Sequence, residues 1–512
     1  MSSPFSRRTL LRTAAVAGSA ATATLALPSR GTAAPLVHRG ARPVLTHGVQ
    51  AGDVLPGSGL VWTRADRPSR MVVEIADNPE FRRARRIPGP VLTPDTDLTG
   101  RVRVPAAART THYRVTAEDL DGRTASEPLT GVFRTQPGGD ERVRLLWSGD
   151  VVGQGWGINP DIGGMRIFSA MAARDADLFL HSGDTVYSDG PLKESVTLPD
   201  GRTWRNVVTP EKSKVAETLT EYRGQFAYNL LDENVRAFAA SVAQINQWDD
   251  HEVLNNWYPG EILTLPEYTE KRVDVLAERA SQAFHEWVPL DPRRAVDGRV
   301  YRRIPYGPHV EIFVLDMRTY RDANGPNTGA DGHILGAGQA RWLVDGLASS
   351  RATWKIVQAD MPLGLCVADG QGAWEAVANG VPGAPSGRES EIAGVLQGLH
   401  RRKVRNVVWV TADVHYTAAH HYSPERASVQ DFDPFWEFVS GPLHAGAFGP
   451  GDLDPSLGPE AVFVQPPPAQ NTSPLDGFQN FGELEVAPGG RELRATLRGQ
   501  RGEELWSTTL TT

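Results

Sequence analysis

Short runs of alternating apolar and polar residues mark the first part of the chain, between residues 40 and 137. The clearest runs are separated by turn signals such as Asp66-Arg-Pro68 and Asp121-Gly122, and they cover residues 59–63, 71–75, 100–104 and 112–116. Alternation with a period of two, bounded by turns, is typical of strands buried on one face. Roughly four to seven such strands over about 100 residues predict an immunoglobulin-like or fibronectin-III-like β-sandwich, with Trp62 and Tyr113 in its core.

Continuous apolar runs follow after residue 141, and helical patterns lie between them. The strand-like runs cover residues 143–147, 178–180, 310–315, 354–358 and 404–410, and a helical pattern covers residues 267–287. This alternation predicts an α/β domain over residues 141–512. Residues 482–486 and 492–497 flank Ala487-Pro-Gly-Gly490 and predict a C-terminal β-hairpin. The Pro- and Gly-rich stretch 136–139 is the expected boundary between the two domains.

The first 34 residues have the pattern of an export signal. Arg7 and Arg8 precede an uncharged run rich in Ala, Thr and Leu over 13–27, and small residues follow at 31–34. This order predicts a twin-arginine signal peptide over residues 1–34. The folded protein is then exported by the Tat machinery to an extracellular or cell-wall-associated location. A transmembrane anchor is disfavoured, because the apolar run is about 15 residues long and a spanning helix needs about 20.

Charge and cysteine content argue against two classes of protein. The chain has 61 acidic and 53 basic residues and a net charge of -8, and removal of the arginine-containing signal would make the charge more negative. An acidic chain disfavours specific nucleic-acid recognition through a basic patch. The single cysteine, Cys366, can form neither an intrachain disulfide nor a multi-cysteine metal site, and we expect it to be a packed small side chain.

Acids, histidines and a tyrosine concentrate in four short sequences, three of which directly follow an apolar strand run. The four are Trp147-Ser-Gly-Asp150, His181-Ser-Gly-Asp-Thr-Val-Tyr187, Trp248-Asp-Asp-His-Glu252 with Asn255 close behind, and Val410-Thr-Ala-Asp-Val-His415. In an α/β layer such residues project from the carboxyl ends of the strands, where ligands bind. Carboxylates and imidazoles together suit hard or borderline cations, and one shared aspartate can bridge two of them. Taken singly, each sequence also fits a helix cap, a turn or a solvated surface.

Longer sequence blocks surround these acids, and together with the twin-arginine signal they cover essentially the whole chain. They are THGVQAGDV, HSGDTVYSDG, WDDHEVLNNW, VLDMRTYRD, QADMPLG, WVTADVHYTAAHHY, EFVSGPLHAGAF and FGELEV. With these blocks the chain resembles the PhoD-like alkaline phosphatases, the alkaline phosphatase D branch of the calcineurin-like metallophosphoesterases. The resemblance implies an α/β (α+β) metallophosphoesterase four-layer sandwich with an N-terminal immunoglobulin/fibronectin-III-like β domain. It also implies a secreted enzyme that hydrolyses phosphate mono- or diesters through a metal-bound hydroxide.

The resemblance further implies a ligand set for two metal ions. Asp184 takes the bridging position, and Tyr187 takes the place of the tyrosinate iron ligand of this branch. Gln358 falls at the end of a predicted strand, where the wider superfamily has a lone histidine. The full implied set is Asp150, Asp184, Tyr187, Asp250, Gln358, Asp413 and His415. His251 takes the place of the histidine that contacts the phosphoryl oxygen or protonates the leaving group.

Two further residues are candidates for contacts with the substrate, and they complete a predicted catalytic set with His251. Arg318 ends a predicted strand, and it could clamp a phosphate through both guanidinium nitrogens or form a structural pair with an aspartate. Asn255 could polarise the substrate or cap a helix. The sequence leaves both possibilities open for each residue.

Asp150 is the clear departure from the family pattern. The founder type of the family has a cysteine ligand after the serine of this block, whereas here Ser148 is followed by Gly149 and Asp150. The family implies Fe3+ and Ca2+ as cofactors. Because a carboxylate in place of a thiolate makes the site harder, Mn2+, Mg2+ and Zn2+ are also compatible with it.

The substrate class and the rival functions rest on the same blocks. The resemblance implies phosphoester small molecules, or phosphate-containing polymers or lipids, as partners. A purple-acid-phosphatase-like enzyme would need Gly-Asn-His-Glu and Gly-His-x-His, and this chain has Asp-Asp-His-Glu and Ala-Asp-x-His instead. Two rival functions stay open, namely a phospholipase D-like phosphodiesterase on the same site and a secreted binding protein with a vestigial metal site.

Overall fold

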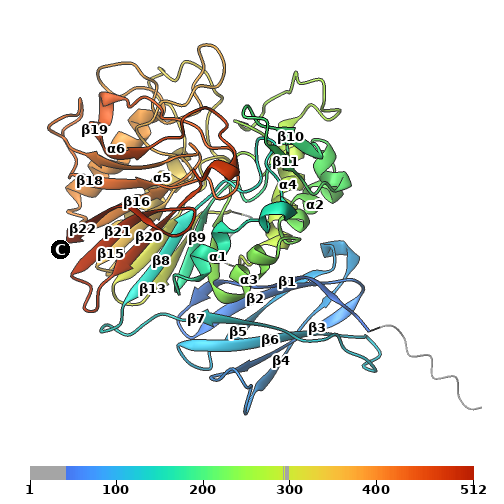
Figure 1. Cartoon of the computed structure of the whole chain (residues 1–512). Coiled ribbons are helices and arrows are strands. Elements are labelled where there is room, and N and C mark those ends of the chain that lie inside the picture. The colour runs from blue at the N-terminus through green and yellow to red at the C-terminus, as the bar shows by residue number, and fades with distance from the viewer. Residues whose placement is uncertain (1–41, 292, 294–298) are drawn as a thin grey trace, which may run out of the picture. The chain divides into compact units, whose positions relative to one another are not determined.

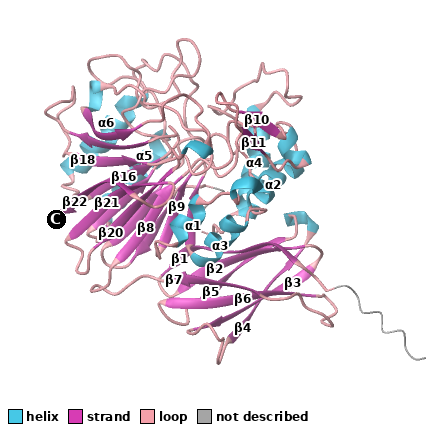
Figure 2. Cartoon of the chain, viewed as in Figure 1, coloured by secondary structure: helices cyan, strands magenta, loops and turns pink. Residues whose placement is uncertain are grey.

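The computed structural model describes residues 42–291, 293 and 299–512 of the chain. The predicted signal peptide over residues 1–34 lies outside these residues. The described strands form sheets of nine, seven, four and two members. Their arrangement is drawn in Figure 1, and helices, strands and loops are distinguished in Figure 2.

The N-terminal strands form two layers with a common core. Four of them make a sheet of their own, in the order β4 (Arg85–Leu92), β3 (Ser69–Ala76), β6 (Thr110–Glu118) and β7 (Leu129–Arg134). Strand β6 alternates strictly between buried and half-buried residues, as its sequence predicts. Its Tyr113 joins a core cluster with Val49 and Val61 of the other layer. Trp62 is also fully buried, but it follows Val61 and therefore packs on the opposite face, near Trp287.

The other N-terminal strands do not form a separate sheet. Strand β1 pairs in parallel with β12 at Gly52 and Gln244, so that β1, β2 and β5 extend the large sheet. The order of that sheet is β22 (Glu504–Thr511), β21 (Glu492–Gly499), β20 (Asn480–Val486), β8 (Val143–Ser148), β9 (Leu178–Ser182), β12 (Ala243–Gln247), β1 (Leu45–Leu55), β2 (Ser58–Ala65) and β5 (Thr99–Pro105). The predicted C-terminal hairpin corresponds to β20 and β21, and β22 continues it.

One face of the seven-stranded sheet packs against the nine-stranded sheet, and the two sheets share a core cluster. Its order is β13 (Arg302–Tyr306), β14 (Val310–Val314), β15 (Trp354–Gln358), β16 (Val407–Thr411), β18 (Phe435–Val439), β17 (Thr417–Tyr422) and β19 (Pro459–Gln465). Leu145 and Leu180 of one sheet lie in the same core cluster as Ile356 and Val410 of the other. A short hairpin of β10 (Ser195–Thr197) and β11 (Thr203–Arg205) stands apart from both sheets.

Helices cover the outer faces of the two large sheets. Leu146 and Phe179 belong to a cluster with residues of α1 (Ile167–Ala172), α2 (Leu219–Asn229), α3 (Glu233–Ser241) and α4 (Val273–Trp287). Val357 and Trp409 belong to one with α5 (Gly336–Ser349) and α6 (Arg388–Arg401). Both faces of the central strands are therefore buried, which is why their sequences are continuous apolar runs. The mixed, sheet-rich architecture agrees with the predicted α/β class at this level.

Two predicted elements begin later than their sequence patterns suggest. Helix α4 begins at Val273 and not at 267, because the preceding residues form a loop closed by an isolated bridge between Ile262 and Arg272. In this loop the Leu263 amide donates to the Lys271 carbonyl at 2.7 Å. Strand β16 begins at Val407 and not at 404, because Lys403 and Asn406 have left-handed φ values of 55° and 56°. Local turn conformations thus shorten both elements without changing their type.

The strands that position the site run in the same direction. Strand β8 is parallel to β9, and β9 is parallel to β12, while β16 is parallel to its neighbours in the other sheet. Each of these four strands ends two or three residues before one of the predicted ligands. The carboxyl ends of parallel strands meet at one edge of a sheet, where open α/β sheets bind ligands.

Candidate metal centre and active site

The acids that follow the strands have an uncommon backbone conformation. Asp150, Asp184 and Asp413 follow β8, β9 and β16, and their φ values are 65°, 49° and 69°. His415 has a φ of 60°. A left-handed residue other than glycine costs about 1–3 kcal/mol and persists only where its surroundings impose it. Such residues cluster at functional sites, and four of them here belong to the predicted ligand set.

Two glycines allow the ligand loops to approach each other closely. Gly183 has a φ of 97°, and a Cβ atom added there would lie 2.4 Å from the Cβ of Asp249. A Cβ atom at Gly441 would lie 2.0 Å from an Asp150 carboxylate oxygen. A side chain at Gly183 would clash with Asp249 close to its backbone, and one at Gly441 would displace the Asp150 carboxylate, so both glycines favour the convergence of the loops.

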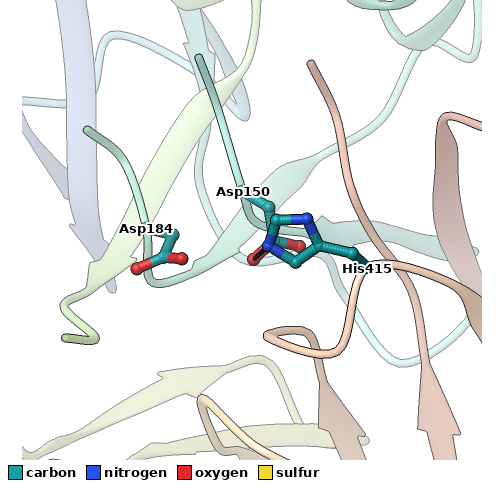
Figure 3. Close-up of side chains that lie close together, drawn as sticks. All are labelled: Asp150, Asp184 and His415. Atoms are coloured by element: carbon teal, nitrogen blue, oxygen red, sulfur yellow. Dashed lines mark ion pairs between the residues drawn. The ribbon is translucent and has the colours of Figure 1, made fainter. Parts of the chain in front are cut away.

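Asp150, Asp184 and His415 form the first group of converging ligands. Their ligand atoms all lie within 4.8 Å of one another, and the three side chains come from separate segments (Figure 3). His415 Nδ1 lies 2.5 Å from the Gly446 carbonyl oxygen, which places the proton on Nδ1. Nε2 is then an acceptor, 2.7 Å from the Tyr187 hydroxyl and 3.8 Å from Asp150 Oδ1. This orientation is typical of metal-binding histidines.

Two further groups adjoin the first and share residues with it. Asp184 belongs to a second group with Asp250 and His251, and Asp250 belongs to a third with Asp249 and Asp413. Asp250 Oδ2 accepts a hydrogen bond of 2.6 Å from the Asn256 backbone amide. Because Asp184 belongs to both the first and the second group, it is common to two neighbouring ligand groups.

The electrostatics of these groups suit a bound cation. Burial, with the repulsion of neighbouring carboxylates, raises the pKa values of Asp150, Asp184 and Asp413 well above the usual range. Both carboxylate oxygens of Asp150 and Oδ1 of Asp250 are buried without a hydrogen-bond partner among the described residues. A cation would compensate the buried charge and occupy these oxygens, and the oxygen and nitrogen donors fit a hard or borderline metal ion.

Tyr187 and His415 are neutral in these surroundings. Burial, with the charges of Asp184 and Asp150, raises the pKa of the Tyr187 phenol well above its usual range. Burial lowers the pKa of His415 to about 4, although its bond to Gly446 opposes the shift. A neutral imidazole with an unprotonated Nε2 is the form that binds metals.

His251 is held by an aspartate that its sequence pattern did not single out. Its Nδ1 lies 2.7 Å from Asp189 Oδ1, and its ring stacks on Tyr187 with the centroids 4.1 Å apart. Asp189 Oδ2 accepts a hydrogen bond of 2.8 Å from the Asn255 backbone amide. Burial lowers the pKa of His251, but Asp189 and two nearby carboxylates raise it more, so that it lies well above 6.5. The signal available in the sequence was an acid in the same loop as Tyr187.

Glu252 connects two ligand loops and was also missed. Its Oε2 accepts hydrogen bonds from the backbone amides of Asp249 at 2.8 Å and Asp184 at 3.2 Å. Its Oε1 accepts one from Thr185 at 2.7 Å. The side chain is fully buried, so it positions the loops and does not reach solvent. Its place directly after His251 was the only hint in the sequence.

Arg318 lies beneath the acids and does not line the cavity described below. It is fully buried, with Nε 2.5 Å from Asp249 Oδ1 and a further ion pair to Glu375. Its Nη2 lies 3.5 Å from Asp413 Oδ1 and 3.9 Å from Asp250 Oδ1. These contacts are those of a structural pair and not of a phosphate clamp, because carboxylates occupy the guanidinium group.

Gln358 has the contacts of a link between the two large sheets. Its Nε2 donates to the His181 carbonyl at 2.8 Å and to the Ile245 carbonyl at 3.3 Å, both in the facing sheet. It is fully buried at the end of β15 and does not line the cavity. Its Oε1, the atom with which an amide binds a metal, is buried without a hydrogen-bond partner among the described residues, so the implied role as a ligand stays a prediction. The other six implied ligands converge.

The acids open into a cavity of about 430 Å³. Asp184, Asp250, His251, Asn255, Asp413 and His415 form part of its lining. Leu365, Cys366 and Phe448 give another part an apolar character. Asn255 is exposed here, in reach of a bound molecule. Cys366 is half-buried in this lining, and burial raises the pKa of its thiol to about 11.

Buried carboxylates and histidines that meet at strand ends below an open cavity form an arrangement that could hold metal ions, as in metal-dependent hydrolases. The sequence profile of the PhoD-like phosphatases matches residues 145–497, and that of the PhoD-like phosphatase N-terminal domain matches residues 31–137. The chain therefore belongs to the PhoD-like phosphatase family, and it is a phosphoric ester hydrolase that acts on phosphoesters.

Two known proteins extend this comparison. Alkaline phosphatase D of Bacillus subtilis (strain 168) is 28% identical over 448 residues, which are 79% of this chain and 70% of the relative. A solved structure titled "Structure of PhoD" superposes with a TM-score of 0.67 at 22% identity, covering 91% of this chain and 89% of the other. The second likeness shows the fold. Among the described residues, no helix is both long and apolar enough to cross a membrane.

Proposed function

We propose that this phosphatase hydrolyses phosphate mono- or diesters by attack of a hydroxide generated at a two-metal centre. The observation that carries the proposal is the position of Asp184, which is common to two neighbouring groups of ligand atoms. One carboxylate shared by two cations is the usual basis of a two-metal site, in which the ions stabilise the attacking and leaving oxygens.

The residues that would hold the ions are those whose side chains converge. They are Asp150, Asp184, Tyr187, Asp250, Asp413 and His415, with Asp249 next to them. Bound there, metal ions would lower the pKa of a coordinated water to near neutrality and stabilise the phosphoryl oxygens. Fe3+ and Ca2+ remain the proposed ions, and Asp150 in place of the family cysteine also makes the site suitable for Mn2+, Mg2+ or Zn2+.

Three other residues have supporting roles in the proposed reaction. His251 faces the cavity and would donate a proton to the leaving oxygen, while Asp189 fixes the orientation of its ring. Arg318 would stabilise the buried carboxylates by its charge, without touching the substrate. Asn255 would contact the substrate from the exposed side of the cavity.

The lining of the cavity favours diesters as the second candidate substrates, as in a phospholipase D-like phosphodiesterase. No lysine or arginine is among the described residues that line it, and its apolar part contains Leu365 and Phe448. A diester carries one charge less than a monoester and a second organic group that apolar side chains can contact. The convergence of the acids disfavours a binding protein with a vestigial site.

The fold and the cellular location complete the proposal. We assign the arrangement of helices and sheets to the four-layer metallophosphoesterase sandwich over residues 141–512, behind an immunoglobulin-like β domain over residues 40–137. The paired arginines at the start of the chain support export through the Tat machinery and an extracellular or cell-wall-associated location.

The test combines elemental analysis of the exported protein with mono- and diester assays on one sample. Asp184→Ala should lose metal and activity together, whereas Asp345→Ala, which alters an exposed aspartate of α5, should lose neither. An active wild-type enzyme without bound metal would overturn the proposal. A fully metal-loaded, active Asp184→Ala variant would overturn the assignment of the shared carboxylate.

A further inference from the structure

We infer that the turn before β4 carries a second, non-catalytic site that binds the phosphate groups of a polyanionic polymer. The site consists of Arg82, Arg83 and Arg85, which line one hollow of about 570 Å³ on the N-terminal part of the chain. All three residues are exposed. We call this hollow, with these three side chains, the arginine hollow.

The three guanidinium groups have no ion-pair partner among the described residues, although the chain has more acidic than basic residues. The nearby Arg86 and Arg114 are paired, each at 2.5 Å, with Glu118 and Glu74. Three neighbouring arginines without an ion-pair partner therefore give this hollow a local excess of positive charge. Such a patch attracts an anion from solution.

The backbone of the turn holds the arginines in a fixed arrangement. The Asn78 side chain accepts a hydrogen bond of 2.9 Å from the Arg82 amide and donates one of 3.1 Å to the Arg82 carbonyl. Phe81 and Arg83 have left-handed φ values of 56° and 57°. The Phe81 ring lies under the Arg114 guanidinium, 4.8 Å from its centroid. A bulky residue adopts this conformation only where its surroundings impose it, so the backbone from which the arginines project is fixed.

The chemistry of the hollow favours phosphate groups. A planar guanidinium group matches two phosphate oxygens at once, and it is more weakly hydrated than a lysine ammonium group. Asp77 also lines the hollow, but its Oδ1 accepts a hydrogen bond of 2.7 Å from the Asn78 side chain. A single exposed contact between one arginine and one phosphate group is weak. A polymer that engages several arginines together gains affinity, because each further contact forms at a high effective concentration.

A polymer fits the hollow better than a membrane or a nucleic acid does. None of the exposed large apolar side chains among the described residues lines the hollow, so nothing there would insert into a lipid layer. No aromatic side chain is among the described residues that line the hollow, and one face of the nearby Phe81 ring is taken by Arg114, so there is no platform for base stacking in the hollow itself. The binding does not depend on the catalytic proposal.

A structural role must be separated from binding, because β4 is an edge strand. It is the outer member of the four-stranded sheet, and charged side chains on an edge prevent pairing with other chains. Arg85 is part of this strand, whereas Arg82 and Arg83 precede it. If edge protection were the reason for the cluster, its removal would cause association of the protein and leave polyanion binding unchanged.

The experiment measures binding of inorganic polyphosphate to the full-length protein by calorimetry over a range of salt concentrations. The test variant is Arg82→Gln/Arg83→Gln/Arg85→Gln, and the control with the same change of charge is Arg351→Gln/Arg401→Gln/Arg491→Gln. We expect the test variant to lose about tenfold or more in affinity. The plot of log affinity against log salt has a negative slope, and its magnitude should decrease by about 2 in the test variant, on the basis of about 0.7 for each lost contact to a single-stranded polyanion. The control should bind like the wild type.

Three results would overturn the inference. The first is equal binding by the wild type and the test variant, or equal losses in the test variant and the control. The second is self-association of the test variant at unchanged affinity, which would show edge protection. The third is stronger cluster-dependent binding to anionic phospholipid vesicles or to single-stranded DNA than to polyphosphate. Asp184→Ala separates the two sites, since it should keep polyphosphate binding while its loss of hydrolysis tests the catalytic proposal.

Discussion

Glu252→Gln is the substitution that best tests how the ligand loops are held together. The side chain is fully buried and is not among the residues that line the cavity, so any effect on activity must pass through the loops. Glutamine keeps the length and shape of the side chain. Burial raises the pKa of Glu252 to about 7, so above that pH the substitution removes a charge. It also replaces one of the two acceptor oxygens by an NH2 donor.

The size of the effect follows from the three hydrogen bonds of Glu252. An amide oxygen in the place of Oε2 can keep the bonds to Asp249 and Asp184, but they become bonds to a neutral acceptor. The Thr185 amide then faces a donor and loses its partner. A hydrogen bond to a charged group contributes about 1.5–3 kcal/mol, and an unsatisfied buried group costs about 1–3 kcal/mol. We expect a total cost of about 2–4 kcal/mol on these grounds.

Part of this cost should appear as weaker metal binding, because Thr185 is covalently attached to the shared ligand Asp184. If the whole cost appeared as weaker metal binding, metal affinity would fall by about 30- to 700-fold, since about 1.4 kcal/mol corresponds to a factor of ten. The assay is chelator competition with elemental analysis, combined with kcat and KM on one aryl phosphate. We expect metal affinity and kcat to fall together while KM changes little.

Glu437→Gln is the matched control for this experiment. Glu437 is another fully buried glutamate, and it accepts hydrogen bonds from Leu363 at 2.7 Å and from Tyr422 at 2.8 Å. Its replacement should lower the free energy of unfolding by a similar amount and leave metal affinity unchanged. The reasoning would be refuted if Glu252→Gln lowered stability as expected but bound metal as tightly as the wild type.

Three further predictions concern residues of the proposed centre. Asp189→Asn and His251→Ala should keep their metal and lower kcat for alkyl esters by about 10²–10⁴-fold. The loss should be smaller for aryl esters, because their leaving groups scarcely need a proton. Loss of metal by His251→Ala in elemental analysis would show that the histidine is a ligand. If Fe3+ is bound, the protein should be coloured, because a phenolate bound to ferric iron absorbs visible light. Tyr187→Phe should then remove the colour. An unchanged absorption spectrum in an iron-loaded variant would contradict binding of Tyr187 to the iron. Arg318→Gln should lower metal content and thermal stability with little change in KM, because the guanidinium group contacts carboxylates and does not line the cavity. A rise in KM at full metal content would instead indicate a phosphate clamp.

The helices and strands and the candidate ligands could be predicted from the sequence, because each gives a pattern within a short stretch of residues. The strand run at 354–358 coincides with β15, and the alternation around residues 112–116 falls within β6. An acid directly after an apolar strand run is likewise a local pattern, which is why Asp150, Asp184 and Asp413 were identified. These patterns depend on the burial of neighbouring residues along one strand, and a window of a few residues contains them.

The partners of these residues were decided by the tertiary structure. Asp189 and Glu252 are ordinary acids in the sequence, and they acquire their roles because their loops fold back onto His251 and Thr185. The sequence around Arg318 fits a phosphate clamp as well as a structural pair, and only the structure shows it buried beside Asp249 and Glu375. Such assignments depend on contacts between residues that are far apart in the chain.

The sheet topology shows the same limit on a larger scale. The sequence predicts strands on both sides of a boundary near residue 137, but the parallel pairing of β1 with β12 joins strands on both sides of it into one sheet. Hydrophobic alternation determines which face of a strand is buried. It does not determine which strand lies beside it, because that choice depends on packing and hydrogen bonding summed over the whole fold.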